Sequence, residues 1–144
     1  MIREMEPEDI FCVFKAEERC FSDPWSSETI RAGLENGLET WLVLEEEEKI
    51  LGYCVFRVVA GEGELLRIAV LPEYQGRGLS KKLMGKVAEY SREKKAEIMF
   101  LEVRESNKRA RNLYRSYGFL EEGIRKDYYC APTENAVIMK ASLI

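Results

Sequence analysis

A short glycine-containing stretch, Gln75 to Lys81, has the composition of an anion-binding turn. An apolar strand is expected before it, over Leu65–Leu71, and an amphipathic helix after it. Such a turn directs free backbone N–H groups and the positive end of a helix at one place. Cations are normally unfavourable there, yet this helix start carries Arg77, Lys81 and Lys82. A bound phosphate would reverse that penalty, and a solvated turn with ordinary lysines is the alternative.

The ionisable residues restrict which chemistry is available. The chain contains no histidine, so acid–base chemistry must use Asp, Glu, Tyr, Lys or Cys, and no His-ligated metal site is expected. The net charge of -4 argues against direct nucleic-acid binding and is compatible with a basic partner. The four cysteines are scattered without a C-x-x-C pair, which favours reduced thiols: Cys12, Cys20, Cys54 and Cys130.

Length and composition indicate one ordinary globular domain over residues 1–144. The chain is 46% hydrophobic and 33% charged, a balance typical of soluble proteins. No apolar run approaches the ~20 residues that cross a bilayer, and no signal peptide is visible. We therefore expect a cytoplasmic protein that does not bind a membrane.

The elements that would position the anion-binding turn alternate along the chain. The first strands are expected to be antiparallel, with exposed turns at Glu45–Lys49 and Gly61–Gly63, whereas Ile98–Val103 should run parallel to Leu65–Leu71. This predicts an α/β (α+β) fold, a mixed sheet with helices on both faces. The other strands are expected at Met1–Met5, Thr40–Leu44, Ile50–Val59, Ile124–Tyr129 and Ala136–Ala141. Helices are expected from Glu6 to about Cys20, from Ser26 or Ser27 to about Glu35, over Leu79–Tyr90 and over Asn107–Tyr117.

Three phosphate-binding patterns can be compared with the turn. The ATPase loop fails because Gly78 is not followed by Lys. The dinucleotide fingerprint fits Gly76 and Gly78 but has Lys81 in place of its third glycine, and it requires a parallel unit before it. The pattern [QR]-x-x-G-x-[GA] fits Gln75 and Gly78, with Ser80 at the small-residue position.

With this pattern the chain resembles the GNAT superfamily of acetyl-CoA-dependent N-acetyltransferases. Leu66–Gly78 is similar to motif A of that family, and Ser106–Tyr114, closing on Gly118-Phe119, is similar to motif B. Further stretches resemble the RimI branch, which acetylates the N-terminal alanine of a small-subunit ribosomal protein: Leu101–Asn107, Phe21–Ser26, and Tyr128-Tyr129 ahead of Glu134–Ala136. The resemblance covers essentially the whole chain. It implies the GNAT fold, with about seven mostly antiparallel strands and a splayed parallel pair.

The resemblance implies acetyl-CoA as co-substrate and no metal. Backbone N–H groups from Gly76 to Ser80 and the charge of Arg77 would hold the pyrophosphate, and the pantetheine arm would pair with the strand edge near Ile68 and Val70. The implied cofactor-binding positions are Ile68, Ala69, Val70, Gln75, Gly76, Arg77, Gly78, Leu79, Ser80, Asn107 and Tyr114.

The resemblance also implies two catalytic residues. Glu102 would accept the proton of the amine, since burial in the apolar run Ile98–Val103 makes a carboxylate a stronger base. The run taken alone favours an acid that is satisfied by Arg104, Arg67 or another cation. Tyr114 would protonate the CoA thiolate, although aromatic residues on the apolar stripe of a helix are usually core residues.

Four aromatic residues would line an acceptor cleft by resemblance: Phe21, Trp25, Tyr128 and Tyr129. The expected acceptor is the N-terminal segment of a protein, beginning with alanine and basic in character. Arg67 and Asn135 differ from the residues usual in the RimI branch and lie toward the acceptor side, which weakens the acceptor assignment. Two alternatives stay open: an acetyltransferase for a small amine (a polyamine or an amino sugar) and a catalytically silent acyl-CoA-binding module.

Overall fold

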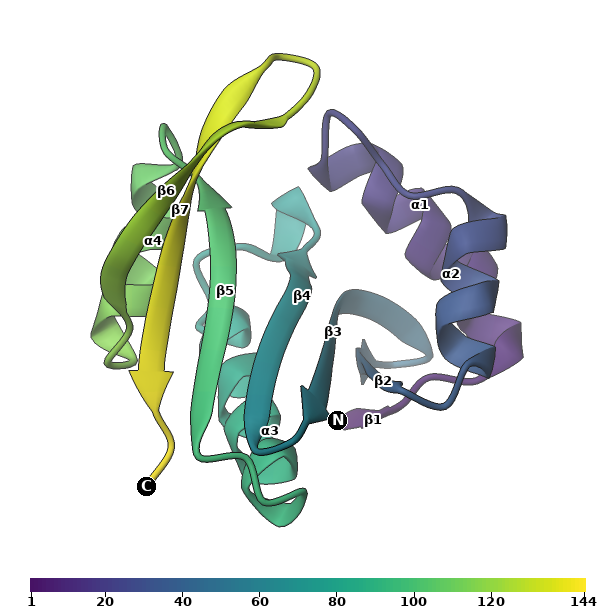
Figure 1. Cartoon of the computed structure of the whole chain (residues 1–144). Coiled ribbons are helices and arrows are strands. Elements are labelled where there is room, and N and C mark those ends of the chain that lie inside the picture. The colour runs from purple at the N-terminus through teal and green to yellow at the C-terminus, as the bar shows by residue number, and fades with distance from the viewer.

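The computed structural model describes all 144 residues, with seven strands in one sheet of order β1-β2-β3-β4-β5-β7-β6 (Figure 1). The strands are β1 (Ile2–Glu4), β2 (Glu39–Glu46), β3 (Lys49–Val59), β4 (Glu62–Val70), β5 (Ile98–Arg104), β6 (Leu120–Tyr129) and β7 (Glu134–Ser142). The α-helices are α1 (Ile10–Cys20), α2 (Ser27–Glu35), α3 (Leu79–Glu93) and α4 (Lys108–Ser116), and short 3-10 turns cover Pro7–Asp9 and Pro72–Tyr74. Every strand pair is antiparallel except β4–β5.

Both faces of the sheet are buried over β2, β3 and β4, where side chains alternate between two cores, whereas β6 is exposed along almost its whole length. Along β2, Leu42 and Leu44 pack in the core that includes α3 and α4, whereas Trp41 and Val43 pack in the core that includes α1 and α2. Figure 1 shows the α1–α2 pair set apart from α3 and α4 by the sheet. The predicted mixed sheet with helices on both faces is confirmed.

The parallel strands β4 and β5 separate partway along their length. Their pairing ends at Leu65 and Leu101, although β4 continues to Val70 and β5 to Arg104. At the point where this pairing ends, β4 has a β-bulge against β3, with Leu66 as the extra residue between Leu65 and Arg67. A bulge of this kind bends the strand. Beyond it β4 stays with β3, and β5 stays with β7. The predicted splayed pair is therefore confirmed, and a wedge opens between the two strands (Figure 1).

Several predicted boundaries differ from the structure, and two of them concern how the strands pack and pair. The turn expected over Gly61–Gly63 occupies only Ala60 and Gly61, and Gly63 lies within β4. A Cβ atom at Gly63 would lie 2.7 Å from the terminal methyl group of Met99 and 3.3 Å from Ile98 O, so the Met99 side chain occupies the space beside this glycine. Strand β6 begins at Leu120, earlier than the expected Ile124, because its pairing with β7 extends past two irregularities in register.

Candidate active site

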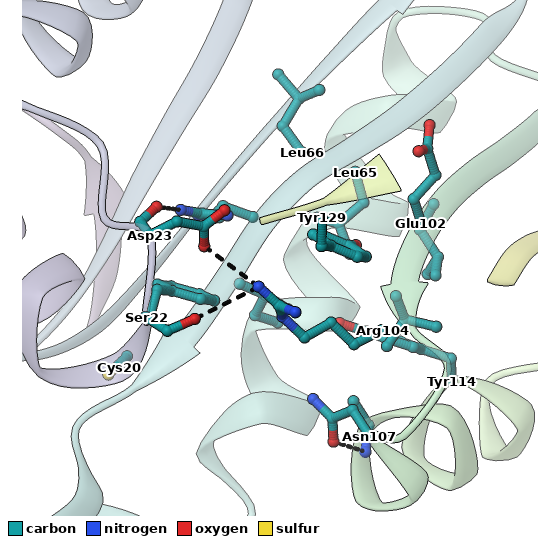
Figure 2. Close-up of a pocket in the computed structure, with 16 residues that line it drawn as sticks. Cys20, Ser22, Asp23, Leu65, Leu66, Glu102, Arg104, Asn107, Tyr114 and Tyr129 are labelled. Carbon is teal, nitrogen blue, oxygen red and sulfur yellow. Dashed lines mark hydrogen bonds and ion pairs between the residues drawn. The ribbon is translucent and has the colours of Figure 1, made fainter. Parts of the chain in front are cut away.

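A cavity of about 390 Å³ lies in the wedge between β4 and β5 (Figure 2). Its walls come from the two splayed strands, the segment after α1, the start of α4 and the end of β6. The structure brings six of the predicted site residues to this cavity: Phe21, Ile68, Glu102, Asn107, Tyr114 and Tyr129. Trp25, Tyr128 and the Gln75–Ser80 turn lie outside its lining.

The turn before α3 presents a run of unused backbone donors. The first backbone N–H after Gln75 to bond within the chain is that of Lys82, which donates to Gly78 O at 3.3 Å. Gly76 and Gly78 have φ values of 85° and 76°, a left-handed conformation that favours glycine. A Cβ atom at either glycine would meet nothing within 4 Å, so the approach to these N–H groups is open. The geometry is that of an anion cradle at a helix N-terminus.

The side chains of Arg77 and Gln75 at this turn already have bonding partners within the chain. Arg77 pairs with Glu46 at 3.1 Å, so its counter-charge is a carboxylate of the hairpin between β2 and β3. Gln75 donates from Nε2 to Val70 O at 3.0 Å and accepts from Arg109 Nη1 at 3.1 Å. The Gln75 side chain therefore braces the turn against β4 and α4. Arg109 was not predicted, because its place beside the turn depends on how α4 docks.

Along the free edge of β4, mainly backbone groups are available to a ligand. Ile68 lines the cavity, whereas Ala69 and Val70 are buried in opposite cores. Leu79, at the start of α3, is buried as well. The contribution that these three buried residues can make to a ligand is thus limited to N–H and C=O groups.

Glu102 holds an unused carboxylate oxygen in the cavity. Its side chain is 21% exposed, and Oε2 is buried without a hydrogen-bond partner. Oε1 lies 3.6 Å from Nε of Arg125, a side chain of β6 that is 58% exposed. The cations proposed in the alternative interpretation pair elsewhere, Arg67 with Glu17 and Arg104 with Glu134. Tyr128 is a second neighbour, and burial together with the charge of the Glu102 carboxylate raises the pKa of that phenol. An exposed arginine at 3.6 Å contributes little, so Glu102 keeps one carboxylate oxygen without a hydrogen bond.

Tyr114 and Asn107 reach the cavity from α4. Tyr114 is buried, packs edge-on against Phe119 at 6.0 Å, and has a pKa raised by burial. It is therefore both a core residue and a lining residue. Asn107 caps the helix by accepting from the Ala110 N–H at 3.1 Å, which leaves its Nδ2 donor for the cavity. In Figure 2 the Glu102 carboxylate points away from Tyr114. Tyr114 belongs to α4, which packs on the face of β5 opposite to the Glu102 side chain.

A buried ion pair lies beneath the segment after α1. Glu17 is 0% exposed and accepts from Arg67 Nε at 3.1 Å, Arg67 Nη2 at 3.0 Å, the Trp25 N–H at 2.7 Å and the Tyr53 hydroxyl. Burial and the charge of Glu17 raise the pKa of Tyr53, which keeps the phenol protonated. This network was not predicted. Its one visible signal was that Glu17 follows Val13 at helical spacing on the apolar face of α1.

The predicted acceptor aromatics are arranged around that ion pair. The Arg67 guanidinium lies 3.9 Å from the Phe21 ring centroid and 4.4 Å from that of Trp25. Tyr129 lines the cavity, with a pKa raised to about 12 by burial and by the charge of Glu102. Tyr128 is 49% exposed and meets Tyr129 edge-on at 5.1 Å. Phe21 and Trp25 are thus loop anchors, and only Phe21 and Tyr129 face the cavity.

Asn135, the second departure from the RimI branch, has a local structural role. Its side-chain oxygen accepts from the Asp127 N–H at 3.0 Å, and its carbonyl accepts from the Glu105 N–H at 3.1 Å. It therefore secures the irregular end of β6. In the chain as a whole, no three His, Cys, Asp or Glu side chains gather closely enough to hold a metal ion. No helix combines the length and the apolar character needed to cross a bilayer.

Comparison with known proteins agrees with this geometry. A sequence model of the acetyltransferase (GNAT) family matches residues 10–119. The chain belongs to the GNAT acetyltransferase family. Members of this family transfer acetyl groups from acetyl-CoA, which matches a wedge with an anion cradle at its side.

Relatives of this GNAT chain extend along its full length. It is 39% identical over 148 residues to the [ribosomal protein bS18]-alanine N-acetyltransferase of Haemophilus influenzae, covering 99% of both chains. It is 37% identical to a putative enzyme of the same name from Bacillus subtilis, covering 96% of this chain and 92% of the relative. The crystal structure of the Escherichia coli ribosomal-protein-S18-alanine N-acetyltransferase superposes with a TM-score of 0.91 at 31% identity, covering 99% of this chain and 93% of that one.

Proposed function

We propose that this GNAT chain acetylates the N-terminal α-amine of a protein that begins with alanine and continues with basic residues. The observation that carries the proposal is the orphan Oε2 of Glu102, buried in a cavity that Tyr114 also lines. The names of the relatives support a ribosomal protein as acceptor. An acceptor of that kind implies action in the cytoplasm.

Several groups of the wedge would hold acetyl-CoA. The free N–H groups from Gly76 to Ser80 and the positive end of α3 would receive the pyrophosphate. The edge of β4 near Ile68 and Val70 has no strand partner and would accept the pantetheine arm as a strand accepts a neighbour, although Val70 O already accepts from Gln75 Nε2. Asn107 Nδ2 would donate to the same arm. Arg77 would contribute charge only after it leaves Glu46.

The two catalytic residues would act from opposite sides of β5, Glu102 on the amine and Tyr114 on the thiolate. An α-ammonium has a pKa of about 8, so Glu102 would take its proton through Oε2 and leave a neutral amine. The amine nitrogen would attack the thioester carbonyl carbon within a ternary complex, the N–C bond forms, and the C–S bond breaks. The second proton of that nitrogen would restore Tyr114 after the tyrosine has protonated the thiolate, and Glu102 would release the first proton to solvent. Tyr114 stays protonated at neutral pH and would donate its hydrogen to the departing thiolate from the other face.

The acceptor end of the cavity favours a positively charged peptide. Its lining holds two carboxylates, Glu102 and Asp23, and two arginines, Arg67 and Arg104, which pair with Glu17 and Glu134. Glu102 and the chain's net charge of -4 are the features that would attract a basic peptide. Phe21 and Tyr129 would contact the first residues of the peptide, with Trp25 and Tyr128 supporting them from outside the lining.

The test is an acceptor panel read by mass spectrometry. It should include peptides that begin with Ala and with other residues, a peptide with a blocked N-terminus and internal lysines, a polyamine and an amino sugar. One acetyl group on the α-amine of the Ala peptides is expected. Acetylation confined to lysine side chains or to the small amines would contradict the proposal. Acetyl-CoA binding by calorimetry without turnover would indicate a silent binding module instead.

Two variants test the assigned roles. Glu102→Gln and Tyr114→Phe should each lower kcat about 100-fold while the Kd for acetyl-CoA stays within twofold. Matched controls are Glu122→Gln, which removes a surface partner of Lys140, and Tyr117→Phe, at the end of α4. Unchanged rates in both catalytic variants would remove the assignments.

A further inference from the structure

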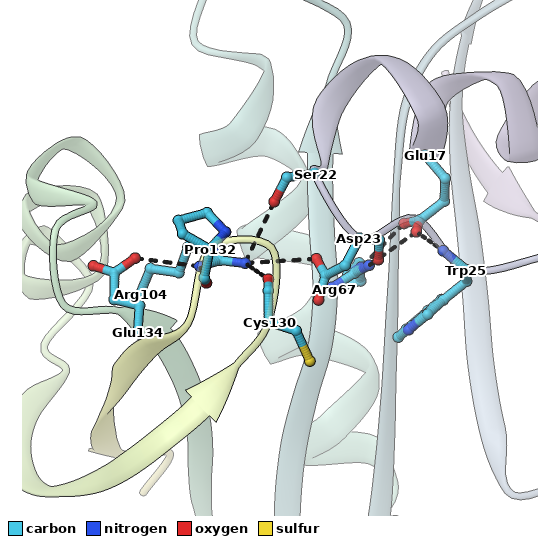
Figure 3. Close-up of polar contacts among 9 residues, drawn as sticks. All are labelled: Glu17, Ser22, Asp23, Trp25, Arg67, Arg104, Cys130, Pro132 and Glu134. Atoms are coloured by element: carbon cyan, nitrogen blue, oxygen red, sulfur yellow. Dashed lines mark hydrogen bonds and ion pairs between the residues drawn. The ribbon is translucent and has the colours of Figure 1, made fainter.

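Arg104 joins two loops that are remote in sequence (Figure 3). It ends β5 and lies on the same face as Glu102, two positions earlier. On one side its Nη2 donates to Cys130 O at 2.7 Å and its Nη1 to Pro132 O at 2.9 Å, both in the loop between β6 and β7. On the other side Nη2 lies 3.4 Å from Ser22 Oγ, in the loop between α1 and α2. We call these the β6–β7 loop (residues 130–133) and the α1–α2 loop (residues 21–26).

Further contacts reinforce both ends of this bridge. Arg104 Nη2 lies 3.8 Å from Asp23 Oδ1, and Nη1 lies 3.3 Å from Glu134 Oε1. Its guanidinium is 4.6 Å from the ring centroid of Tyr129, which faces the cavity. Every hydrogen bond and ion pair between the α1–α2 loop and the β6–β7 loop passes through Arg104. Figure 3 shows the guanidinium between the two loops.

The α1–α2 loop is therefore held by one arginine from each arm of the wedge. Arg67 of β4 holds it from the interior, through Glu17 and through the Asp23 carbonyl at 3.1 Å. Arg104 of β5 holds it from the cavity side. The distances on the β6–β7 side are shorter than those to Ser22 and Asp23, so the α1–α2 side is the weaker half of the bridge.

We propose that Arg104 is a positioning residue for the acceptor: it fixes the separation of the α1–α2 and β6–β7 loops, so that the peptide meets a preformed cleft. The assignment of the peptide rests on the proposed function. The planar guanidinium fork can serve two loops at once, whereas a lysine ammonium on the same strand cannot reproduce that geometry. Loss of the bridge should impose the cost of ordering both loops on peptide binding.

The decisive variant is Arg104→Lys, which keeps the charge and removes the fork. Its KM for the alanine peptide should rise about tenfold, with kcat and the Kd for acetyl-CoA within twofold of wild type. The matched control is Arg3→Lys. Arg3 also makes a network of bonds, to Asp9, Glu45 and Glu4 O, but it lies on β1 and outside the cavity lining.

Hydrogen–deuterium exchange gives a readout that needs no acceptor. In Arg104→Lys the amides of both loops should exchange faster than in wild type, while those of α3 do not change, and Arg3→Lys should leave both loops at the wild-type rate. A Ser22→Ala/Asp23→Asn double variant should increase exchange in the α1–α2 loop, because it removes the weaker half of the bridge alone.

The two proposals fail separately. If wild type acetylates no peptide, the proposed function is wrong, and the exchange experiment still decides whether Arg104 orders the loops. If wild type is active but Arg104→Lys changes neither loop exchange nor peptide KM, the positioning role is overturned. A loss of acetyl-CoA affinity equal to the rise in peptide KM would also overturn it, because that result indicates general destabilisation.

Discussion

Removing one partner of the buried pair of Arg67 and Glu17 should destabilise the fold strongly. Replacing Arg67 by Met removes two of the four donors to Glu17 and leaves a carboxylate that is 0% exposed with only the Trp25 N–H and the Tyr53 hydroxyl. Removing one partner of a buried ion pair typically costs about 3–5 kcal/mol. That is a large fraction of the about 5–15 kcal/mol that stabilises a typical domain.

Urea unfolding followed by circular dichroism would measure this loss directly. Tryptophan fluorescence adds a local report, because Trp25 packs edge-on against Trp41 at 5.8 Å. Arg3→Met is the matched control, since the Arg3 pairs are partly exposed and should contribute about 1 kcal/mol or less. The double variant Glu17→Leu/Arg67→Met should cost less than the sum of the two single variants, because no buried charge is then left unpaired.

An Arg67→Met loss no greater than that of Arg3→Met would refute the reasoning. It would mean that water reaches Glu17 or that the carboxylate becomes protonated without cost. Strict additivity in the double variant would refute it as well, since the two side chains would then not be coupled.

Two further predictions concern the alkaline limb of stability and the anion cradle. The pKa of Tyr53 is raised in the folded state, so its contribution is full below about pH 10 and is lost as the pH rises, by up to about 1.4 kcal/mol per pH unit. Urea unfolding of Tyr53→Phe should therefore depend less steeply on pH between about 10 and 12 than wild type, and equal slopes would contradict the assignment. Gly78→Ala should weaken acetyl-CoA binding and cost about 1 kcal/mol of stability, because φ is 76° there. Gly85→Ala, in open space within α3, should leave binding unchanged and stabilise the helix by about 0.5–1 kcal/mol, and equal Kd values for the two variants would argue against the cradle.

Local patterns account for the parts of the site that depend on backbone. The free N–H groups at Gly76–Ser80 follow from a strand, a glycine turn and a helix start, all of which are visible in the sequence. The parallel placement of β5 follows from the helix that separates it from β4. The turn was predictable because it is set by residues within a few positions of one another, and the parallel pairing was predictable because a helical crossover between two strands fixes their relative direction.

Side-chain partners were less predictable, because tertiary contacts choose among several candidates. Arg67 was considered as a partner for Glu102, yet it bonds Glu17, fifty positions away along the chain. Arg77 was predicted to bind the pyrophosphate of acetyl-CoA, yet in the structure it pairs with Glu46 of the β2–β3 hairpin. In both cases the residue type was informative, and the partner depended on how helices and hairpins dock against the sheet.

The splay of β4 and β5 has a consequence beyond cofactor binding. Where two parallel strands separate, the backbone groups and side chains along their facing edges no longer contact the other strand and can contact other parts of the chain or a ligand. Here β4 contributes Arg67 and β5 contributes Arg104, and both hold the α1–α2 loop. Under the proposed function, the opening that would leave an edge for acetyl-CoA is thus the same opening that would supply the supports of the acceptor cleft. A substitution at Arg104 should therefore alter acceptor use, measured as peptide KM, before it alters the Kd for acetyl-CoA.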